Sequence, residues 1–215
     1  MTEYRHIINV KPDKYHSIIN ETGEILRQGG VVIYPTDTVY GLGGLISNEE
    51  SLERIFSLKK RPLNLALPVI IAEYEDLSNL VSFVSEEAWK VMHEFWPGAL
   101  TIILSARDGL SPILLGGKKT IGVRMPGYQF CRDIVRSAGG PLVSTSANNS
   151  GEPPANEINS ISQSLKDSVN LIIDGGTIIS AGPSTVIDMS GGKILIRREG
   201  NITKEKLRKV LPDIE

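Results

Sequence analysis

The chain has 215 residues, of which 40% are hydrophobic and 22% charged, so it can build the core of an ordinary globular protein. Its net charge of -2 and pI near 6.0 argue against a general polyanion binder, which needs a surplus of cations. The single Cys131 excludes an intrachain disulfide, and the three scattered histidines show no zinc-ligand spacing. Without a signal-peptide core or an apolar run of roughly 18 residues, we expect a cytoplasmic protein with no membrane segment.

The expected elements begin with a helix after Pro12 that Gly29 and Gly30 end. The β-branched run VVIY at 31–34 predicts a buried strand, and the segment TDTVYGLGG at 36–44 is expected to be a polar, glycine-rich loop. A second helix from about Asn48 to Lys59 then brings the sequence KKRP to its C-terminal end.

Strands and helices alternate along the rest of the chain. Strands are predicted at 67–72, 99–106, 120–125, 141–146, 170–174, 184–189 and 193–198, and helices near 74–81, 85–95, 127–138, 155–166 and 203–211. The strands are apolar runs rather than strict polar alternations, which favours an α/β sheet covered by helices. No repeat or long linker divides the chain, so we expect a single domain over residues 1–215.

The KKRP segment, Lys59 to Pro62, has two explanations. Cations near a helix C-terminus interact favourably with the helix dipole and proline is a common stop, so a solvated helix end needs no ligand. The alternative is an anion-binding site, with Lys59 and Arg61 facing the ligand and Lys60 facing solvent.

Further polar residues follow strands. Ser144, Thr145, Ser146 and Asn148 end one apolar run, in a composition suited to holding phosphate or carboxylate oxygens. A serine nucleophile would need a GxSxG sequence or a paired histidine, and the chain has neither, so binding is favoured over covalent catalysis. A plain polar turn explains these residues equally well.

Single polar residues also lie in or at the ends of other strands, namely Arg124, Ser184, Thr185 and Arg198. Ligand sites of α/β sheets gather at strand ends, so together these clusters predict one cleft for a molecule with phosphate and carboxylate groups. The Walker spacing GxxxxGK[ST] is absent, including at GGKKT (116–120).

Six motifs, in this order and with these gaps, closely resemble the YrdC/TsaC family of threonylcarbamoyl-AMP synthases: YPTDTVYGLG, KKRP, IGVRMP, STSANNSGEP, PSTVID and RREG. The resemblance covers residues from about 20 to 205. It implies a twisted, mixed, YrdC-like α/β sheet with a large basic concave cavity. It also implies synthesis of L-threonylcarbamoyladenylate and pyrophosphate from L-threonine, bicarbonate or CO2, and ATP, for the t6A modification at position 37 of tRNA.

The resemblance also implies residue roles. Lys59 and Arg61 would be the catalytic pair that clamps the phosphates and the carbamate, with Mg2+ accompanying ATP and no dedicated metal site. The threonine-binding residues would be Thr38, Arg124, Ser144 and Ser184. The nucleotide-binding residues would be Lys59, Arg61, Thr120, Ser146, Asn148 and Arg198.

This sequence departs from the family where many relatives have Asn-Pro-Leu and then a histidine: it has Leu65, Ala66 and Leu67, and Ile70 at the histidine position. It resembles the short form, without the C-terminal Sua-type domain. Threonylcarbamoyl-transferase proteins are the expected downstream partners. The alternative function is a double-stranded RNA-binding module without adenylate synthesis, while carbamoyl transfer in hydrogenase maturation would need zinc modules that one cysteine cannot supply.

Overall fold

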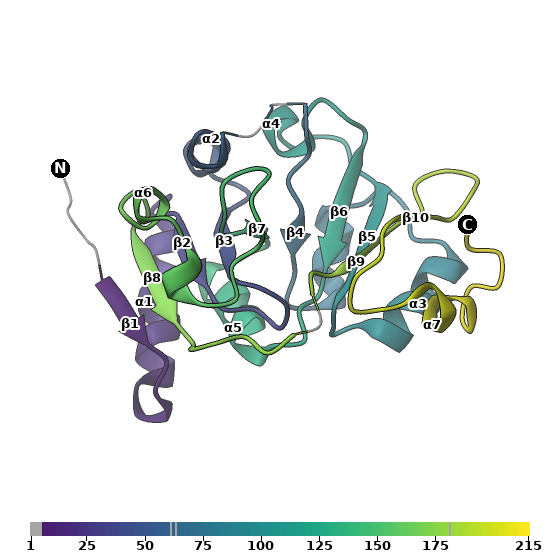
Figure 1. Ribbon diagram of the computed structural model, residues 1–215. Coiled ribbons are helices and arrows are strands. Elements are labelled where there is room, and N and C mark those ends of the chain that lie inside the picture. The colour runs from purple at the N-terminus through teal and green to yellow at the C-terminus, as the bar shows by residue number, and fades with distance from the viewer. Residues whose placement is uncertain (1–5, 61, 63, 181) are drawn as a thin grey trace.

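A ten-stranded mixed sheet runs through the described part of the chain (Figure 1), with the strand order β1-β8-β2-β3-β7-β4-β6-β5-β9-β10. The structure is a computed structural model that describes residues 6–60, 62, 64–180 and 182–215. Four neighbouring strand pairs are parallel (β1/β8, β2/β8, β4/β6 and β5/β9), and the other five are antiparallel. The mixed α/β class expected from the sequence is confirmed.

The strands are β1 (His6–Asn9), β2 (Val32–Tyr34), β3 (Gly41–Leu45), β4 (Val69–Ile70), β5 (Leu100–Ser105), β6 (Thr120–Arg124), β7 (Leu142–Ser146), β8 (Leu171–Asp174), β9 (Thr185–Asp188) and β10 (Leu195–Arg198). The α-helices are α1 (Tyr15–Arg27), α2 (Glu49–Lys59), α3 (Glu86–Phe95), α4 (Pro112–Leu115), α5 (Gln129–Ala138), α6 (Gln163–Lys166) and α7 (Lys204–Arg208). Short 3-10 helices are η1 (Pro12–Lys14), η2 (Tyr74–Asn79) and η3 (Ile158–Ser160).

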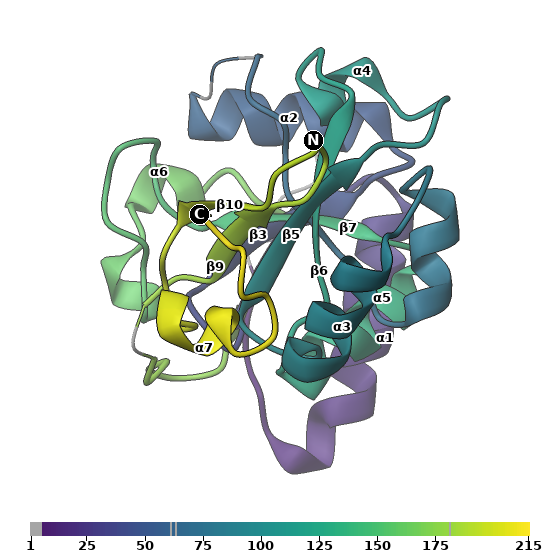
Figure 2. The ribbon, with the colours of Figure 1, turned by 90° about the vertical axis from the view of Figure 1, so that its right-hand side faces the viewer.

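Two apolar clusters hold the helices on the sheet. In one, Leu26 of α1 and Phe130 of α5 are buried with Val32 and Leu171 of the strands. The other joins α2, α3 and α7 to residues of strands β2 to β9, and Figure 2 shows α3 and α7 beside the β5 and β9 end. Burial of this apolar surface is the main force that fixes the helices around the sheet.

The prediction of a loop over residues 36–44 is wrong in its second half, because Gly41–Leu45 form strand β3 between β2 and β7. A Cβ on Gly43 would lie 2.7 Å from the Val143 carbonyl oxygen and 2.8 Å from Cε1 of Tyr34. A Cβ on Gly44 would lie 3.0 Å from Oγ of Ser51. The glycines therefore allow close approach within the sheet rather than freedom in a loop.

Other differences are smaller. The helix expected near 74–81 is the 3-10 helix η2, and the one expected near 155–166 divides into η3 and the four-residue α6. Strand β1 and helix α4 were not predicted. Within the described residues, no helix combines the length and apolar character needed to cross a bilayer.

Candidate functional site

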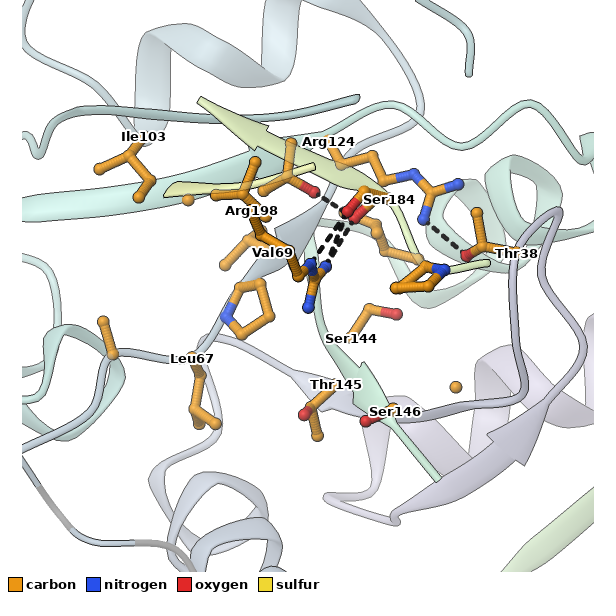
Figure 3. Close-up of a pocket in the computed structure, with 18 of the residues that line it drawn as sticks. Thr38, Leu67, Val69, Ile103, Arg124, Ser144, Thr145, Ser146, Ser184 and Arg198 are labelled. Atoms are coloured by element: carbon orange, nitrogen blue, oxygen red, sulfur yellow. Dashed lines mark hydrogen bonds between the residues drawn. The ribbon is translucent and has the colours of Figure 1, made fainter. Parts of the chain in front are cut away.

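A cavity of about 390 Å³ opens where the central strands meet the loops that follow β2 and β7. Figure 3 shows Thr38, Arg124 and Ser184 on one side of this cavity, and Leu67 and Ile103 on the other. Among the described residues that line it, the charged ones are all cations, namely Lys118, Arg124 and Arg198. The cavity thus has polar side chains around Arg124 and Ser184 on one side and apolar side chains around Leu67 and Ile103 on the other.

Strand periodicity explains which side chains of β6 reach the cavity. Thr120, Gly122 and Arg124 line it, whereas Ile121 and Val123 are buried in the larger apolar cluster. Alternate residues of a strand point to opposite faces of the sheet, so a single strand supplies both core and cavity residues.

Arg124 is held rigidly, with 8% of its surface exposed. Its Nε donates to the Gly98 carbonyl oxygen (2.9 Å), and its Nη1 donates to Thr38 Oγ1 (2.9 Å). Its Nη2 donates to Asp37 Oδ1 (2.6 Å), and Asp37 Oδ2 accepts the backbone N–H of Gly127 (3.0 Å). An arginine fixed in this way presents its remaining N–H groups in a defined direction.

Arg198 is held by neutral groups instead. Its Nε and Nη2 donate to the Ser184 carbonyl oxygen (3.1 and 2.9 Å), and Nη2 also reaches Ser184 Oγ (3.2 Å). The Ser184 hydroxyl lies 3.0 Å from Thr101 Oγ1. Burial, and to a lesser extent the positive charge of Arg124, lower the pKa of Arg198. Since no carboxylate of the described residues forms an ion pair with Arg198, an anion in the cavity would be stabilised there.

The end of β7 supplies the hydroxyls of Ser144, Thr145 and Ser146 to the cavity. Tyr34 lies beside Ser144, fully buried, and burial raises the pKa of its hydroxyl. This hydroxyl is therefore neutral at physiological pH. It adds bulk and polarity behind Ser144 without adding charge.

Lys59 is the last residue of α2 and is only 2% exposed. Its Nζ donates to the carbonyl oxygens of Ser146 (2.5 Å) and Asn148 (2.8 Å) and to Asn148 Oδ1 (3.1 Å). The next residue, Lys60, is exposed and left-handed at φ 48°, and it ends the helix. Lys59 thereby joins the end of α2 to the loop after β7.

The structure brings most of the predicted site residues together. Those that line the cavity are Thr38, Thr120, Arg124, Ser144, Ser146, Ser184 and Arg198. Lys59 and Asn148 are not lining residues but contact Ser146. Arg61 lies outside the described residues. The roles assigned to all ten residues stay predictions, as does a basic surface larger than this cavity.

The sequence analysis assigns no site role to Asp37, Thr101 or Lys118. Asp37 lies in the polar segment TDTVYGLGG, but only the fold shows that it pairs with Arg124. Thr101 lies within an apolar run. The four departures from the family pattern, Leu65, Ala66, Leu67 and Ile70, all line the cavity and form part of its apolar side.

The family model Sua5_yciO_yrdC, described as "Telomere recombination", matches residues 24–200. A curated relative from Pyrococcus abyssi, named threonylcarbamoyl-AMP synthase, is 33% identical over 97% of this chain and 61% of its own length. Relatives of the same name from Bacillus subtilis and Idiomarina loihiensis are 36% and 38% identical, over 91% and 74% of this chain and 57% and 87% of their own. The chain therefore spans about three-fifths of the length of the first two.

Solved structures show the same fold. Pyrococcus abyssi Sua5 complexed with L-threonine has a TM-score of 0.92 and 33% identity, covering 98% of this chain and 62% of that one. E. coli YciO has a TM-score of 0.80 and 31% identity, covering 93% and 96% of the two chains.

Proposed function

The chain belongs to the Sua5/YciO/YrdC family, and we propose that it is an L-threonylcarbamoyladenylate synthase. Its substrates would be L-threonine, bicarbonate or CO2, and ATP, and its product would serve the t6A modification of tRNA. The observation that carries the proposal is the pair of arginines on one cavity. Arg124 is fixed by three acceptors, and the acceptors that the described residues offer Arg198 are all neutral.

The proposed reaction has two steps. The threonine amine attacks CO2 and loses a proton, which gives a carbamate. A carbamate oxygen then attacks the α-phosphorus of ATP, and the bond from that phosphorus to the β-phosphate oxygen breaks, so pyrophosphate leaves with the electron pair. Such a transfer depends on positioning and on neutralising charge, for which a cavity of cations and hydroxyls is suited.

The residues fit these tasks as follows. Arg124, with Thr38, Ser144 and Ser184, would bind threonine at the polar side of the cavity, the arginine pairing with its carboxylate. The nucleotide would contact Thr120, Ser146, Asn148 and Arg198. Lys59 and Arg61 would act on the phosphates and the carbamate, although Lys59 would have to exchange carbonyl partners for phosphate oxygens.

Magnesium is expected to arrive with ATP. The described residues include no cluster of three or more His, Cys, Asp or Glu side chains that could hold a metal ion. We expect phosphate oxygens and water to supply most of its ligands, as is common for this ion. Direct contact with tRNA and with downstream threonylcarbamoyl-transferase proteins belongs to the same proposal.

Pyrophosphate release tests the proposal. The purified protein should release pyrophosphate from ATP only when threonine and bicarbonate are both present. Arg61→Ala and Arg124→Ala should each abolish release while far-ultraviolet circular dichroism stays unchanged. Pyrophosphate release that does not depend on threonine would contradict the proposed function. Wild-type turnover in Arg124→Ala would contradict the assignment of the site.

A further inference from the structure

We propose that Lys118 is a further nucleotide-binding residue, whose ammonium group binds a phosphate of ATP at the end of the cavity away from Arg124. The inference rests on the proposed function and extends it by one residue. Thr120, Gly122 and Arg124 of β6 line the cavity, and so does Lys118, which lies two residues before the strand and extends this row.

The register of the sheet gives this row its direction. Gly122 pairs with Ile103 and Thr120 with Ser105. Figure 3 shows Ile103 on the side of the cavity away from Thr38. The row of lining residues therefore runs from Arg124, past the position beside Ile103, to Lys118. Six residues of extended backbone separate the Cα atoms of Arg124 and Lys118 by at most about 20 Å. If threonine binds at Arg124, an extended nucleotide points toward Lys118.

The backbone of Lys118 is fixed even though its side chain is exposed. Gly116 and Gly117 turn the chain at φ 56° and 70°, and the Lys118 N–H donates to the Leu115 carbonyl oxygen (3.1 Å). A Cβ on Gly116 would lie 2.6 Å from the backbone nitrogen of Ala66, so the turn packs closely on the segment that follows KKRP. Binding at Lys118 would then order only the lysine side chain.

Charge favours a phosphate as the partner. Lys118 forms no ion pair with a carboxylate among the described residues, and the charged residues there that line the cavity are all cations. A lysine ammonium is a compact point charge that suits phosphate oxygens, whereas the planar fork of Arg124 suits a carboxylate. The neighbouring Lys119 is also exposed, but it does not line the cavity.

Lys119 supplies the matched control. Lys118→Met keeps most of the apolar stem and removes the charge, and Lys119→Met makes the same change one residue away. We expect Lys118→Met to raise the KM for ATP by about 3- to 5-fold, the upper part of the range for an ion pair that is open to solvent. The KM for threonine should stay within about twofold, Lys118→Arg should recover most of the loss, and Lys119→Met should match wild type.

Calorimetric binding of a non-hydrolysable ATP analogue, without threonine, separates this inference from the proposed function. A wild type that binds the analogue but makes no pyrophosphate contradicts the synthase proposal. In that case, a lower affinity of Lys118→Met than of wild type for the analogue would still support the role of Lys118 in nucleotide binding. Equal affinities for Lys118→Met and Lys119→Met, or a rise in the threonine KM instead of the ATP KM, would overturn the inference.

Discussion

The ion pair between Arg124 and Asp37 offers the sharpest test of how the site is held together. The two side chains are 10% and 21% exposed and meet at 2.6 Å. Asp37→Ala removes a charge-assisted hydrogen bond worth about 1.5–3 kcal/mol and the bond to the Gly127 N–H, worth about 1 kcal/mol. It also leaves Arg124 without its only carboxylate among the described residues. We expect the free energy of unfolding to fall by about 3 kcal/mol.

Urea denaturation at neutral pH measures this change, with Lys193→Ala as the control. Lys193 pairs with Glu215, but the two side chains are 69% and 56% exposed, so the free energy of unfolding should change by no more than about 0.5 kcal/mol. The KM for threonine should rise in Asp37→Ala because Arg124 loses one of its three anchors. A loss of stability below about 1 kcal/mol, or no difference from the control, would refute the idea that Asp37 fixes Arg124.

Two further predictions concern stability. Lys60→Gly should raise the free energy of unfolding by about 0.5 kcal/mol, because Lys60 has a left-handed backbone conformation (φ 48°) that glycine adopts without strain. Chemical denaturation measures this change, and a lower free energy of unfolding in the variant would contradict the prediction. The pKa of Asp188 is lowered because, although burial opposes ionisation, hydrogen bonds from Ser190 and Arg197 favour the carboxylate. Its stabilising effect is therefore present above the unfolded pKa of 3.8 and is lost as the pH falls through the lower folded pKa. Asp188→Asn should reduce the unfolding midpoint at pH 7 but much less near pH 3, and an equal reduction at both pH values would argue against this linkage.

Much of the fold could be predicted because buried strands leave a strong signal. Runs such as ALTIILSA at 99–106 and NLIID at 170–174 are apolar and β-branched, and the structure places strands β5 and β8 within them. Strand β3 could not be found in this way, because GLGGL has little intrinsic strand preference. Its glycines are explained only by Tyr34, Val143 and Ser51, which approach them from other segments.

Some residues of the site could likewise be predicted from the sequence, and others could not. Arg124 and Ser184 were predicted because each is a polar residue at the end of an apolar strand, and both line the cavity. No role could be assigned to Asp37 or Thr101 from the sequence, because their partners, Arg124 and Ser184, are more than 80 residues away along the chain. The sequence does not indicate a role for Lys118, because GGKKT lacks the Walker spacing, but the structure places Lys118 on the cavity two residues before β6.

The most direct test of the proposed chemistry is the fate of labelled carbon. Incubation of the protein with ATP, L-threonine and ¹³C-bicarbonate, followed by rapid mass spectrometry, should give a threonine-containing adenylate that carries one ¹³C atom, together with pyrophosphate. Arg124→Ala should give none. An adenylate without the label, or AMP and pyrophosphate formed equally well without threonine, would contradict the claim that this cavity joins the three substrates.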